Sequence, residues 1–290
     1  MSAALPTLNL IGAGRVGQTL ARLWTQAGVF AVQDVLTTST ASAQAACDFI
    51  GAGKPSSGMD RMRAANLWLI ATTDARIASV AAALAQQAVA LESPTGTTVF
   101  HCSGALSAAE LAPLAALGWY TASAHPILSF ANPDTACAQF AGTPCALEGK
   151  AEACGPLHAA FSAIGAQCFD VRSQDKLLYH AGAVFATNFM PVLQAVAEDA
   201  WRASGVPQAL LPHLRASLLH NAVANITRLG PQGALTGPAA RGDTAAIARQ
   251  ADALAQWDAT AAEAYSALSA LALRMANTSS TTATSAANKR

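Results

Sequence analysis

Charged side chains are scarce in this sequence of 290 residues. Lys and Arg together number 17, as do Asp and Glu, so only 12% of the chain is charged and the formal net charge is +0. Nucleic acids and anionic membranes are bound through clustered Lys and Arg, and this composition therefore excludes both as the main partner. The 52% of hydrophobic residues excludes disorder throughout the chain.

Metal-binding and targeting patterns are also missing. The six cysteines form no C-x-x-C pair, and none has a histidine at zinc-ligand spacing, so we expect reduced thiols and no metal site. No basic segment precedes the first apolar run, which argues against a signal peptide. The apolar stretch 177–196 contains His, Asn and Pro, and we interpret it as a buried helix, not a membrane span. We therefore expect a cytoplasmic protein.

Short apolar runs alternate with alanine-rich stretches in the first part of the chain. Strands are predicted at 7–11, 35–38, 67–72, 97–101, 120–125, 144–147 and 167–171. Alternating strands and helices are typical of an α/β fold with a mainly parallel sheet. Beyond residue 172 only helices are predicted, over 173–204, 209–228 and 244–275. We expect an α/β domain at 1–172, a helical domain at 173–276 and a disordered tail at 277–290.

A glycine-rich loop directly follows the first predicted strand. Its G-x-G-x-x-G pattern consists of Gly12, Ala13, Gly14, Arg15, Val16 and Gly17. An amphipathic helix begins at the same place, and its N-terminus offers free N–H groups and a positive dipole end to a pyrophosphate. The pattern in this context predicts a dinucleotide site. The alternative is a plain glycine turn between strand and helix.

The residues after the second predicted strand favour NADP over NAD. An NAD site usually has an acidic residue there, about 20 residues beyond the glycine motif. Here the run 37–40 contains only threonine and serine, and we expect Asp34 in the turn that leads into the strand. Hydroxyl groups together with Arg15 suit a 2′-phosphate. We therefore predict cofactor contacts from Thr38 and Ser39.

Several short motifs resemble a known family. They are Thr72-Thr73-Asp74, His101-Cys102-Ser103-Gly104-Ala105, His125-Pro126, Tyr179-His180-Ala181-Gly182, Ala186-Thr187-Asn188 and the run from Ala234 to Asp243. Together they are similar to the Rossmann-like family that carries a C-terminal domain of unknown function. That family is related to pyrroline-5-carboxylate reductase and to the 6-phosphogluconate dehydrogenase-like superfamily. The resemblance covers most of residues 7–265.

The resemblance implies a particular architecture and activity. It implies a Rossmann dinucleotide-binding domain, followed by an all-helical domain like the C-terminal domain of 6-phosphogluconate dehydrogenase. It also implies an NADP-dependent oxidoreductase with a cleft between the domains and a homodimer formed through the helical one. It does not supply a substrate.

Polar residues that follow three predicted strands are candidates for the cofactor site. Ligands of open α/β sheets bind beyond the carboxyl ends of the strands. We expect Thr72, Thr73 and Asp74 near the nicotinamide ribose, although Asp74 is also a candidate helix N-cap. Ser103 and Gly104 allow a ring to approach the backbone, or they form only a turn from strand to helix.

Four residues are predicted to act in catalysis. His125 is held extended before a proline, and its imidazole is suited to give or take a proton; a buried structural histidine is the alternative. Lys176, His180 and Asn188 share one predicted helix face, in a series with Val184 in which each residue is four positions from the next. In related hydroxyacid dehydrogenases the catalytic lysine corresponds to Val184 here, so that mechanism does not carry over. Asn188 is also placed to satisfy backbone freed by a nearby proline.

The loop 236–243 is the candidate substrate anchor. Thr236 and the N-terminal amides of the next helix suit a carboxylate, and Arg241 is able to clamp one; a local Arg241–Asp243 ion pair is the alternative. We therefore predict an NADP-dependent oxidoreductase that moves a hydride between nicotinamide and a small carboxylate-bearing substrate with a C=N, C=O or CH–OH group. A dinucleotide- or metabolite-sensing protein without turnover is the second hypothesis.

Overall fold

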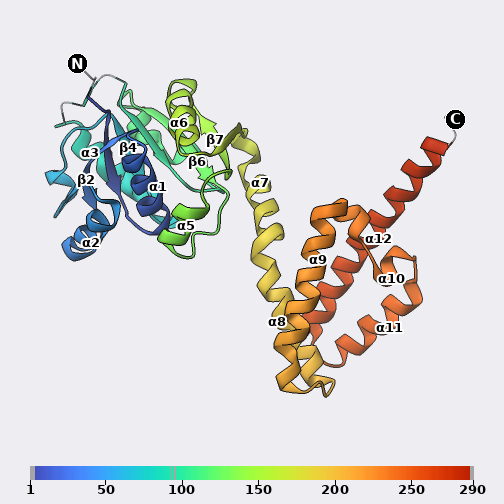
Figure 1. Cartoon of the computed structure of the whole chain (residues 1–290). Coiled ribbons are helices and arrows are strands. Elements are labelled where there is room, and N and C mark those ends of the chain that lie inside the picture. Colours follow the sequence, from blue (N-terminus) through green and yellow to red (C-terminus); the bar gives the residue numbers. More distant parts are fainter. Residues whose placement is uncertain (1–3, 92, 95, 288–290) are drawn as a thin grey trace. The chain divides into compact units, whose positions relative to one another are not determined.

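The computed structural model describes residues 4–91, 93–94 and 96–287 (Figure 1). The chain forms two compact units, Met1–Ala186 and Thr187–Arg290. The sequence placed the change of domain at residue 173, whereas the first unit continues to Ala186. The physical reason is that Lys176 and Tyr179, beyond the predicted boundary, are hydrogen-bonded to residues of the sheet domain.

An eight-stranded sheet forms the centre of the first unit. Its order is β3-β2-β1-β4-β5-β6-β7-β8, and β7 alone runs antiparallel to its neighbour β6 among the pairs described. The strands are β1 Thr7–Ile11, β2 Ala31–Leu36, β3 Lys54–Pro55, β4 Leu67–Ile70, β5 Thr98–His101, β6 Tyr120–Pro126, β7 Pro144–Gly149 and β8 Gln167–Asp170. Seven of the eight match predicted strands, and the two-residue β3 has no apolar run that would reveal it.

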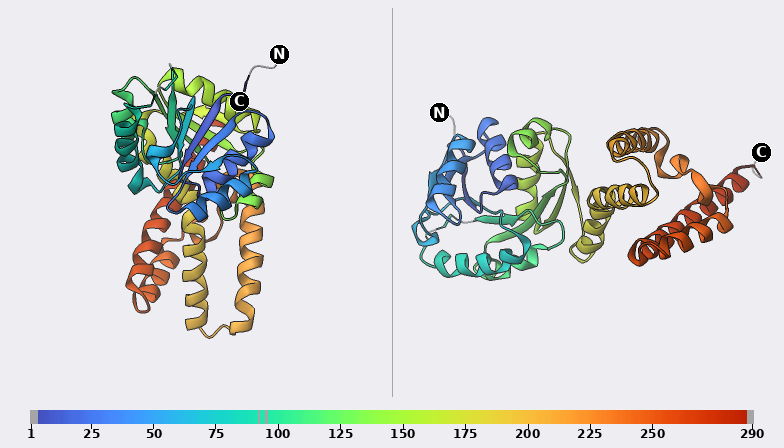
Figure 2. Two further views of the ribbon diagram at one scale, coloured as in Figure 1. Left: turned by 90° about the vertical axis from the view of Figure 1, so that its left-hand side faces the viewer. Right: turned by 90° about the horizontal axis from the view of Figure 1, so that it is seen from below.

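Helices cover both faces of this sheet (Figures 1 and 2). One apolar core includes Trp24 of α1, Ile50 of α2 and Phe161 of α6, and the other includes Ile77 of α3 and Leu114 of α4. The helices are α1 Arg15–Gln26, α2 Thr40–Ile50, η1 Met59–Arg61, α3 Asp74–Ala88, η2 Ala108–Leu111, α4 Ala112–Ala115, α5 Pro133–Gln139, α6 Ala151–Ala163, η3 Ser173–Asp175 and α7 Lys176–Ala183. This arrangement is the predicted Rossmann-like α/β architecture.

A fully buried asparagine stabilises an irregular step between β1 and β2. The strand register shifts between Leu8 and Leu10, and the Oδ1 atom of Asn9 accepts the backbone N–H of Asp34 over 3.1 Å. Its Nδ2 atom donates to the carbonyl of Arg63 over 2.6 Å. Asp34 itself lies inside β2, buried, and accepts hydrogen bonds from the Arg63 side chain. The prediction of Asp34 in a turn was therefore wrong, because β2 begins earlier than its apolar run suggests.

Replacing Asn9 with leucine is expected to destabilise the fold by about 2–4 kcal/mol. The substitution leaves the Asp34 N–H and the Arg63 carbonyl without their side-chain partner, and that loss is costly in a buried place. Urea unfolding of the variant measures the change. A matched Gln18→Leu variant removes one half-buried side-chain bond, to the Ala13 carbonyl, and should lose less stability. Equal stability of Asn9→Leu and wild type would contradict the account.

The second unit is helical throughout its described part. Its elements are α8 Phe189–Ala203, η5 Gln208–Leu210, α9 Leu211–Ala234, α10 Gly237–Ala240, α11 Thr244–Ala255 and α12 Ala259–Ala287. A π-helical segment, η4 Val184–Asn188, connects α7 to α8 across the boundary of the two units. The direction of α9 changes at Gly230, whose φ of 72° lies in the left-handed region that glycine adopts readily. None of the helices in the described residues has the length and hydropathy of a membrane-spanning segment.

Three expectations about this helical part differ from the structure. The helix predicted over 244–275 is two helices, since the chain turns between Ala255 and Ala259 and Asp258 caps the second one. The tail predicted to be disordered from residue 277 continues α12 to Ala287, although most of its residues are serine and threonine, and residues 288–290 lie outside the described residues. The stretch 177–196 was predicted to be buried, yet Leu177 is 72% and Leu178 77% exposed in the single chain.

Candidate functional site

The glycine loop has the geometry of a nucleotide loop. Gly12 has a φ of +83°, and a Cβ atom there would meet the Ala71 carbonyl oxygen at 2.7 Å. A Cβ on Gly17 would meet the Gly12 carbonyl oxygen at 2.8 Å, so both glycines are required by the packing of helix α1 on the strands. Gly14 is different, because its φ is −72° and no atom lies within 4 Å of a Cβ built there. The protein itself therefore does not require glycine at position 14.

The space beside Gly14 is open and lies at the start of α1. Gly14 is the N-cap of α1, and it has no side chain that could accept a hydrogen bond. The first N–H groups of this helix therefore face the loop without a side-chain cap. Such a helix start attracts phosphate groups. Arg15 is exposed at the first position of α1, and Ala13 and Val16 complete the loop.

Hydroxyl side chains follow β2 as predicted, but some of them already form hydrogen bonds with neighbouring residues of the chain. Ser39 is the N-cap of α2, and its Oγ atom accepts the backbone N–H of Ser42 over 3.1 Å. Thr38 is exposed beside it. No acidic residue occupies this strand end, since Asp34 is engaged by Arg63 inside the strand. The residues present are therefore compatible with a 2′-phosphate.

Ser103 is the centre of a hydrogen-bonded loop between β5 and η2. Its hydroxyl donates to Asp74 Oδ2 over 2.7 Å and accepts the backbone N–H groups of Ala105 and Leu106. Asp74 is thus tied to Ser103 and is not the cap of α3, because the N-cap position belongs to Thr73. Thr72 and Thr73 lie just before α3, after β4. All three polar groups of Ser103 are bonded within the protein, so it shapes the loop and has no free hydroxyl.

Lys176 is buried at the start of α7, with 2% of its surface exposed. Its Nζ atom donates to the Ser103 carbonyl over 3.0 Å and is hydrogen-bonded to the hydroxyl of Ser123 in β6. Burial lowers the pKa of this ammonium, and the charge of Glu148 acts in the opposite direction. These contacts make Lys176 a support of the Ser103 loop, whereas the sequence suggested an open catalytic position.

Two histidines and a tyrosine meet above Gly104. The Nδ1 atom of His125 is hydrogen-bonded to the hydroxyl of Tyr179 over 2.8 Å. The rings of His125 and His180 lie edge to face with centroids 5.7 Å apart. A Cβ on Gly104 would meet His180 Nδ1 at 2.4 Å and His125 Nε2 at 2.9 Å, so only glycine fits beneath the two imidazoles. His180 Nδ1 is buried and has no hydrogen-bond partner among the described residues.

Burial affects the protonation of His125 and Tyr179. The pKa of His125 is lowered to about 4, mainly by burial and also by the charges of His180 and Lys176, while Asp74 acts in the opposite direction. Burial also raises the pKa of Tyr179 to about 12. At neutral pH the pair is therefore a neutral imidazole bonded to a neutral phenol, an arrangement able to shift a proton along one hydrogen bond.

The protein is expected to lose stability as the pH falls from 6.5 toward 4. An unfolded histidine has a pKa near 6.5, whereas folded His125 has a pKa of about 4, so its contribution is fully present above pH 6.5 and is lost through this window. The loss from His125 at pH 5 is about 2 kcal/mol at most. Urea unfolding at pH 7 and pH 5 measures it. His125→Gln should lose less than wild type between these values, and an equal loss would contradict the assignment.

The remaining predicted residues belong to the second unit or its border. Asn188 ends the π-helical segment, and its Oδ1 atom accepts a hydrogen bond from Thr187 over 2.8 Å. The wider π-helical turn interrupts the four-residue spacing, so Asn188 does not continue the line of Lys176 and His180. Thr236 and Arg241 are exposed at the two ends of α10. Asp243 caps α11, because its Oδ1 atom accepts the backbone N–H of Ala246 over 2.9 Å.

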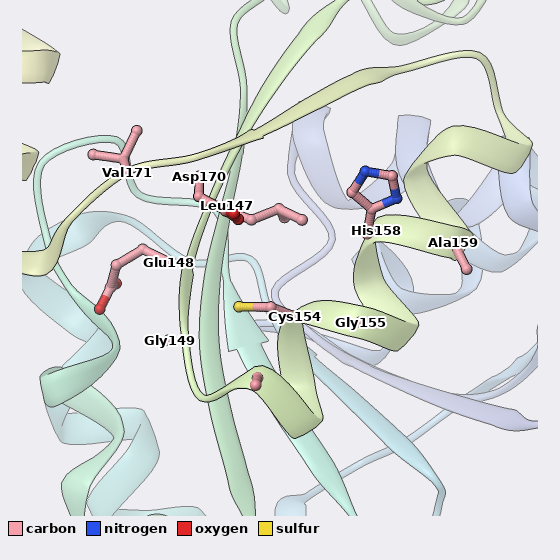
Figure 3. A pocket seen from close by; sticks show the side chains of 10 residues that line it. Leu147, Glu148, Gly149, Cys154, Gly155, His158, Ala159, Asp170 and Val171 are labelled. Carbon is pink, nitrogen blue, oxygen red and sulfur yellow. The ribbon is translucent and has the colours of Figure 1, made fainter.

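A cavity of about 590 Å³ lies beside α6 and the ends of β7 and β8 (Figure 3). His158, Cys154 and Asp170 line it. Burial raises the pKa of the Cys154 thiol to about 11, which leaves it protonated and unreactive at neutral pH. The group of His125, Tyr179 and His180 around Gly104 is the better candidate site, because these side chains converge and the pKa values of His125 and Tyr179 are strongly shifted.

Sequence reasoning gave no role to three residues in and around this site, Tyr179, His101 and Ser123. Tyr179 and His101 were noted only as members of family motifs, and Ser123 only as part of a predicted strand. A serine or histidine at the alternate positions of a buried strand was the available signal for Ser123 and His101, since such positions are usually apolar. Nothing in the sequence paired Tyr179 with His125.

Comparisons with known proteins agree with this fold. Residues 2–126 match the Rossmann-like domain, and residues 143–272 match a domain of unknown function, DUF2520. No curated protein matches the sequence.

Three solved structures are similar over nearly the whole chain. A protein from Thermotoga maritima has 22% identity and a TM-score of 0.74, covering 94% of this chain and 99% of its own. A candidate NADP oxidoreductase from Bacteroides fragilis has 20% identity and a TM-score of 0.70, covering 93% and 98%. Pyrroline carboxylate reductase from Plasmodium falciparum, solved with NADP bound, has 12% identity and a TM-score of 0.56, covering 93% and 98%. At these identities the likeness concerns the fold. The two domain matches show that this chain belongs to the Rossmann-like family with a C-terminal DUF2520 domain, as its motifs indicated.

Proposed function

We propose that this protein is an NADP-dependent oxidoreductase that moves a hydride between nicotinamide and a small carboxylate-bearing substrate. The observation that carries the proposal is the position of the glycine loop relative to Asp74, Ser103 and His125. The glycine loop follows β1, Asp74 follows β4, Ser103 follows β5 and His125 lies near the end of β6. These four strands are parallel neighbours, so the glycine loop and the cluster share one edge of the sheet, where such folds bind ligands.

The chain's own residues account for cofactor binding in this proposal. The amides of the glycine loop and the start of α1 hold the pyrophosphate, and the open space beside Gly14 admits it. Arg15, Thr38 and Ser39 recognise the 2′-phosphate, and Thr72 and Thr73 border the nicotinamide ribose. When bound, the cofactor supplies or accepts the hydride at C4 of its nicotinamide ring. Solved relatives that bind or are named for NADP support the choice of dinucleotide.

The accompanying proton is handled by His125 and Tyr179. His125 is a neutral ring, and Tyr179 is bonded at its Nδ1 atom, which leaves Nε2 for a substrate atom. Such a ring passes a proton by taking one at one nitrogen and giving one from the other. His180 packs against His125 and confines the position of its ring. Lys176 and Ser103 act on this site by holding the loop on which Gly104 lies.

We also propose roles for three residues of the second unit. Asn188 is proposed to orient the substrate, and Thr236 and Arg241 to anchor its carboxylate by hydrogen bonds and charge. The name of the Plasmodium relative, pyrroline carboxylate reductase, refers to a small carboxylate-bearing compound and supports this substrate class.

We further propose that the protein is a homodimer formed through the helical unit. Large apolar side chains are exposed on α8 and α9, including Val192, Leu218, Val223 and Leu229. A run of exposed apolar side chains on a chain with a hydrophobic majority is typical of a protein interface. Sedimentation equilibrium tests this assignment: a mass twice that of the 29.4 kDa chain supports it, and a mass of one chain overturns it.

Turnover assays test the enzyme activity. NADPH oxidation is followed with cyclic imino acids, 2-keto acids and matched amides that lack the carboxylate. The proposal expects turnover with at least one acid and much weaker turnover with its amide. Tight NADPH binding without turnover of any compound in such a panel would instead favour a sensing function.

A further inference from the structure

His101 has a hydrogen-bonding arrangement that the proposed function does not yet use. It ends strand β5, is fully buried, and pairs across the sheet with Ser123 of β6. Its Nδ1 atom accepts the backbone N–H of Ser103 over 3.1 Å, and its Nε2 atom lies 3.0 Å from the Ser107 carbonyl oxygen. Because an N–H group donates to Nδ1, the ring must be neutral with its proton on Nε2. The tautomer is therefore fixed by two backbone groups.

These two bonds join the ends of the loop between β5 and η2. Ser103 and Ser107 stand at opposite ends of the segment that contains Gly104, and His101 contacts both. The other side of this loop is held by Asp74 through the Ser103 hydroxyl and by Lys176 through the Ser103 carbonyl. The imidazole is thus the internal support of the loop over which His125 and His180 pack.

Histidine suits this place for a specific chemical reason. The loop offers one donor and one acceptor, and a neutral imidazole supplies one acceptor and one donor on opposite sides of a rigid ring. Burial lowers the pKa of His101, and Lys176 lowers it too, while the Ser107 carbonyl, Glu148 and Asp74 act in the opposite direction. An apolar ring of the same size would leave the Ser103 N–H without a partner, and it would remove one of the two hydrogen bonds to the Ser107 carbonyl, which also accepts the backbone N–H of Glu110.

We propose that His101 is a positioning residue, which sets the loop 102–107 in the conformation that places Gly104 beneath His125 and His180 and beside the bound cofactor. The part of this proposal that concerns the cofactor rests on the proposed function. The part that concerns the two histidines rests on the structure of the chain alone. A loop that is set in advance binds its ligand without an ordering cost.

Three variants separate the contributions of the two hydrogen bonds. His101→Phe keeps a ring and removes both bonds. His101→Asn retains an acceptor for the N–H group two residues later, as in an Asx turn, and His101→Gln has no such local geometry. His158→Phe, an exposed histidine on α6, is the matched control. The full-length protein is labelled with ¹⁵N-histidine, the ring signals of His125 and His180 are recorded, and NADPH binding is measured by nicotinamide fluorescence.

The proposal expects His101→Phe to move the ring signals of His125 and His180 and to raise the Kd for NADPH about tenfold. His101→Asn should keep the wild-type signals and a Kd within about threefold. Unchanged signals and affinity in His101→Phe would overturn the proposal. If that variant does not fold, equal behaviour of His101→Asn and His101→Gln would overturn it, because only the first retains the Ser103 bond.

An error in the proposed function would give a different set of results from an error in the role of His101. If wild-type protein does not bind NADPH, the oxidoreductase assignment fails, and the ring signals of His125 and His180 still decide whether His101 positions the loop.

Discussion

Replacement of Gly14 by valine is expected to raise the Kd for NADPH at least about 100-fold, which corresponds to roughly 2.7 kcal/mol of binding free energy. The new side chain would occupy the space beside the start of α1, where no protein atom lies within 4 Å of the Cβ position. That space is proposed to admit the pyrophosphate. Because the φ of −72° is allowed for valine, the free energy of unfolding should change by no more than about 1 kcal/mol.

Gly12→Ala is the contrasting variant for this prediction. Gly12 has a φ of +83° and its Cβ would meet the Ala71 carbonyl, so alanine there is expected to reduce both the stability and the affinity for NADPH. Nicotinamide fluorescence and urea unfolding measure the two quantities on each variant. Wild-type affinity in a folded Gly14→Val protein would contradict the assigned phosphate position.

His125→Gln is expected to lower kcat by about 10² to 10³-fold with an active substrate. Glutamine keeps a polar side chain of similar length, but it does not pass a proton from Tyr179 to the substrate. The Kd for NADPH should stay within about threefold of wild type, since the phosphate and ribose contacts are unchanged. Steady-state kinetics and the fluorescence titration measure the two effects separately.

Two further measurements make this prediction specific. The pKa of His125 is about 4, so His125 should not cause an inflection near pH 6.5 in the pH profile of kcat/KM. Any inflection seen near pH 6.5 in the wild type should therefore persist in His125→Gln. His158→Gln, on the exposed side of α6, should retain wild-type kinetics. A kcat for His125→Gln within threefold of wild type would show that His125 does not transfer the proton.

The parts of the fold that depend on local pattern were predictable from the sequence. The glycine loop was recognised because its spacing, the strand before it and the amphipathic helix after it all indicate the same turn. His125, Asp74 and Ser103 were recognised as candidates because each polar residue follows an apolar run. In the structure these three residues come together at one edge of the sheet, by the parallel order of β4, β5 and β6.

The roles of Lys176 and Asp34 could not be predicted in this way. A lysine at the start of a helix is usually exposed, and only the packing of α7 on β5 and β6 buries this one against Ser103 and Ser123. Asp34 was misplaced because its strand begins with alanine, valine and glutamine, a weakly apolar start that does not mark a boundary. The contact between Tyr179 and His125 joins residues 54 positions apart and leaves no periodic signal.

The helical unit was predictable in type but less so in its boundaries. No glycine or proline marks the π-helical segment at Val184–Asn188 or the turn before Ala259, so neither stands out in the sequence. The apolar side chains of 177–196 were expected in a core because periodicity in a single sequence does not tell a buried helix from one whose apolar side chains are exposed in the single chain.

The most direct test of the central claim is a fluorescence titration of the purified protein with NADPH and with NADH. The account predicts saturable NADPH binding at micromolar concentration or tighter, with NADH binding at least about tenfold weaker, because hydroxyl groups and Arg15 replace the acidic residue that an NAD site uses. Binding of neither nucleotide at micromolar concentration would contradict the oxidoreductase assignment. Preference for NADH would contradict the assignment of Arg15, Thr38 and Ser39 to a 2′-phosphate.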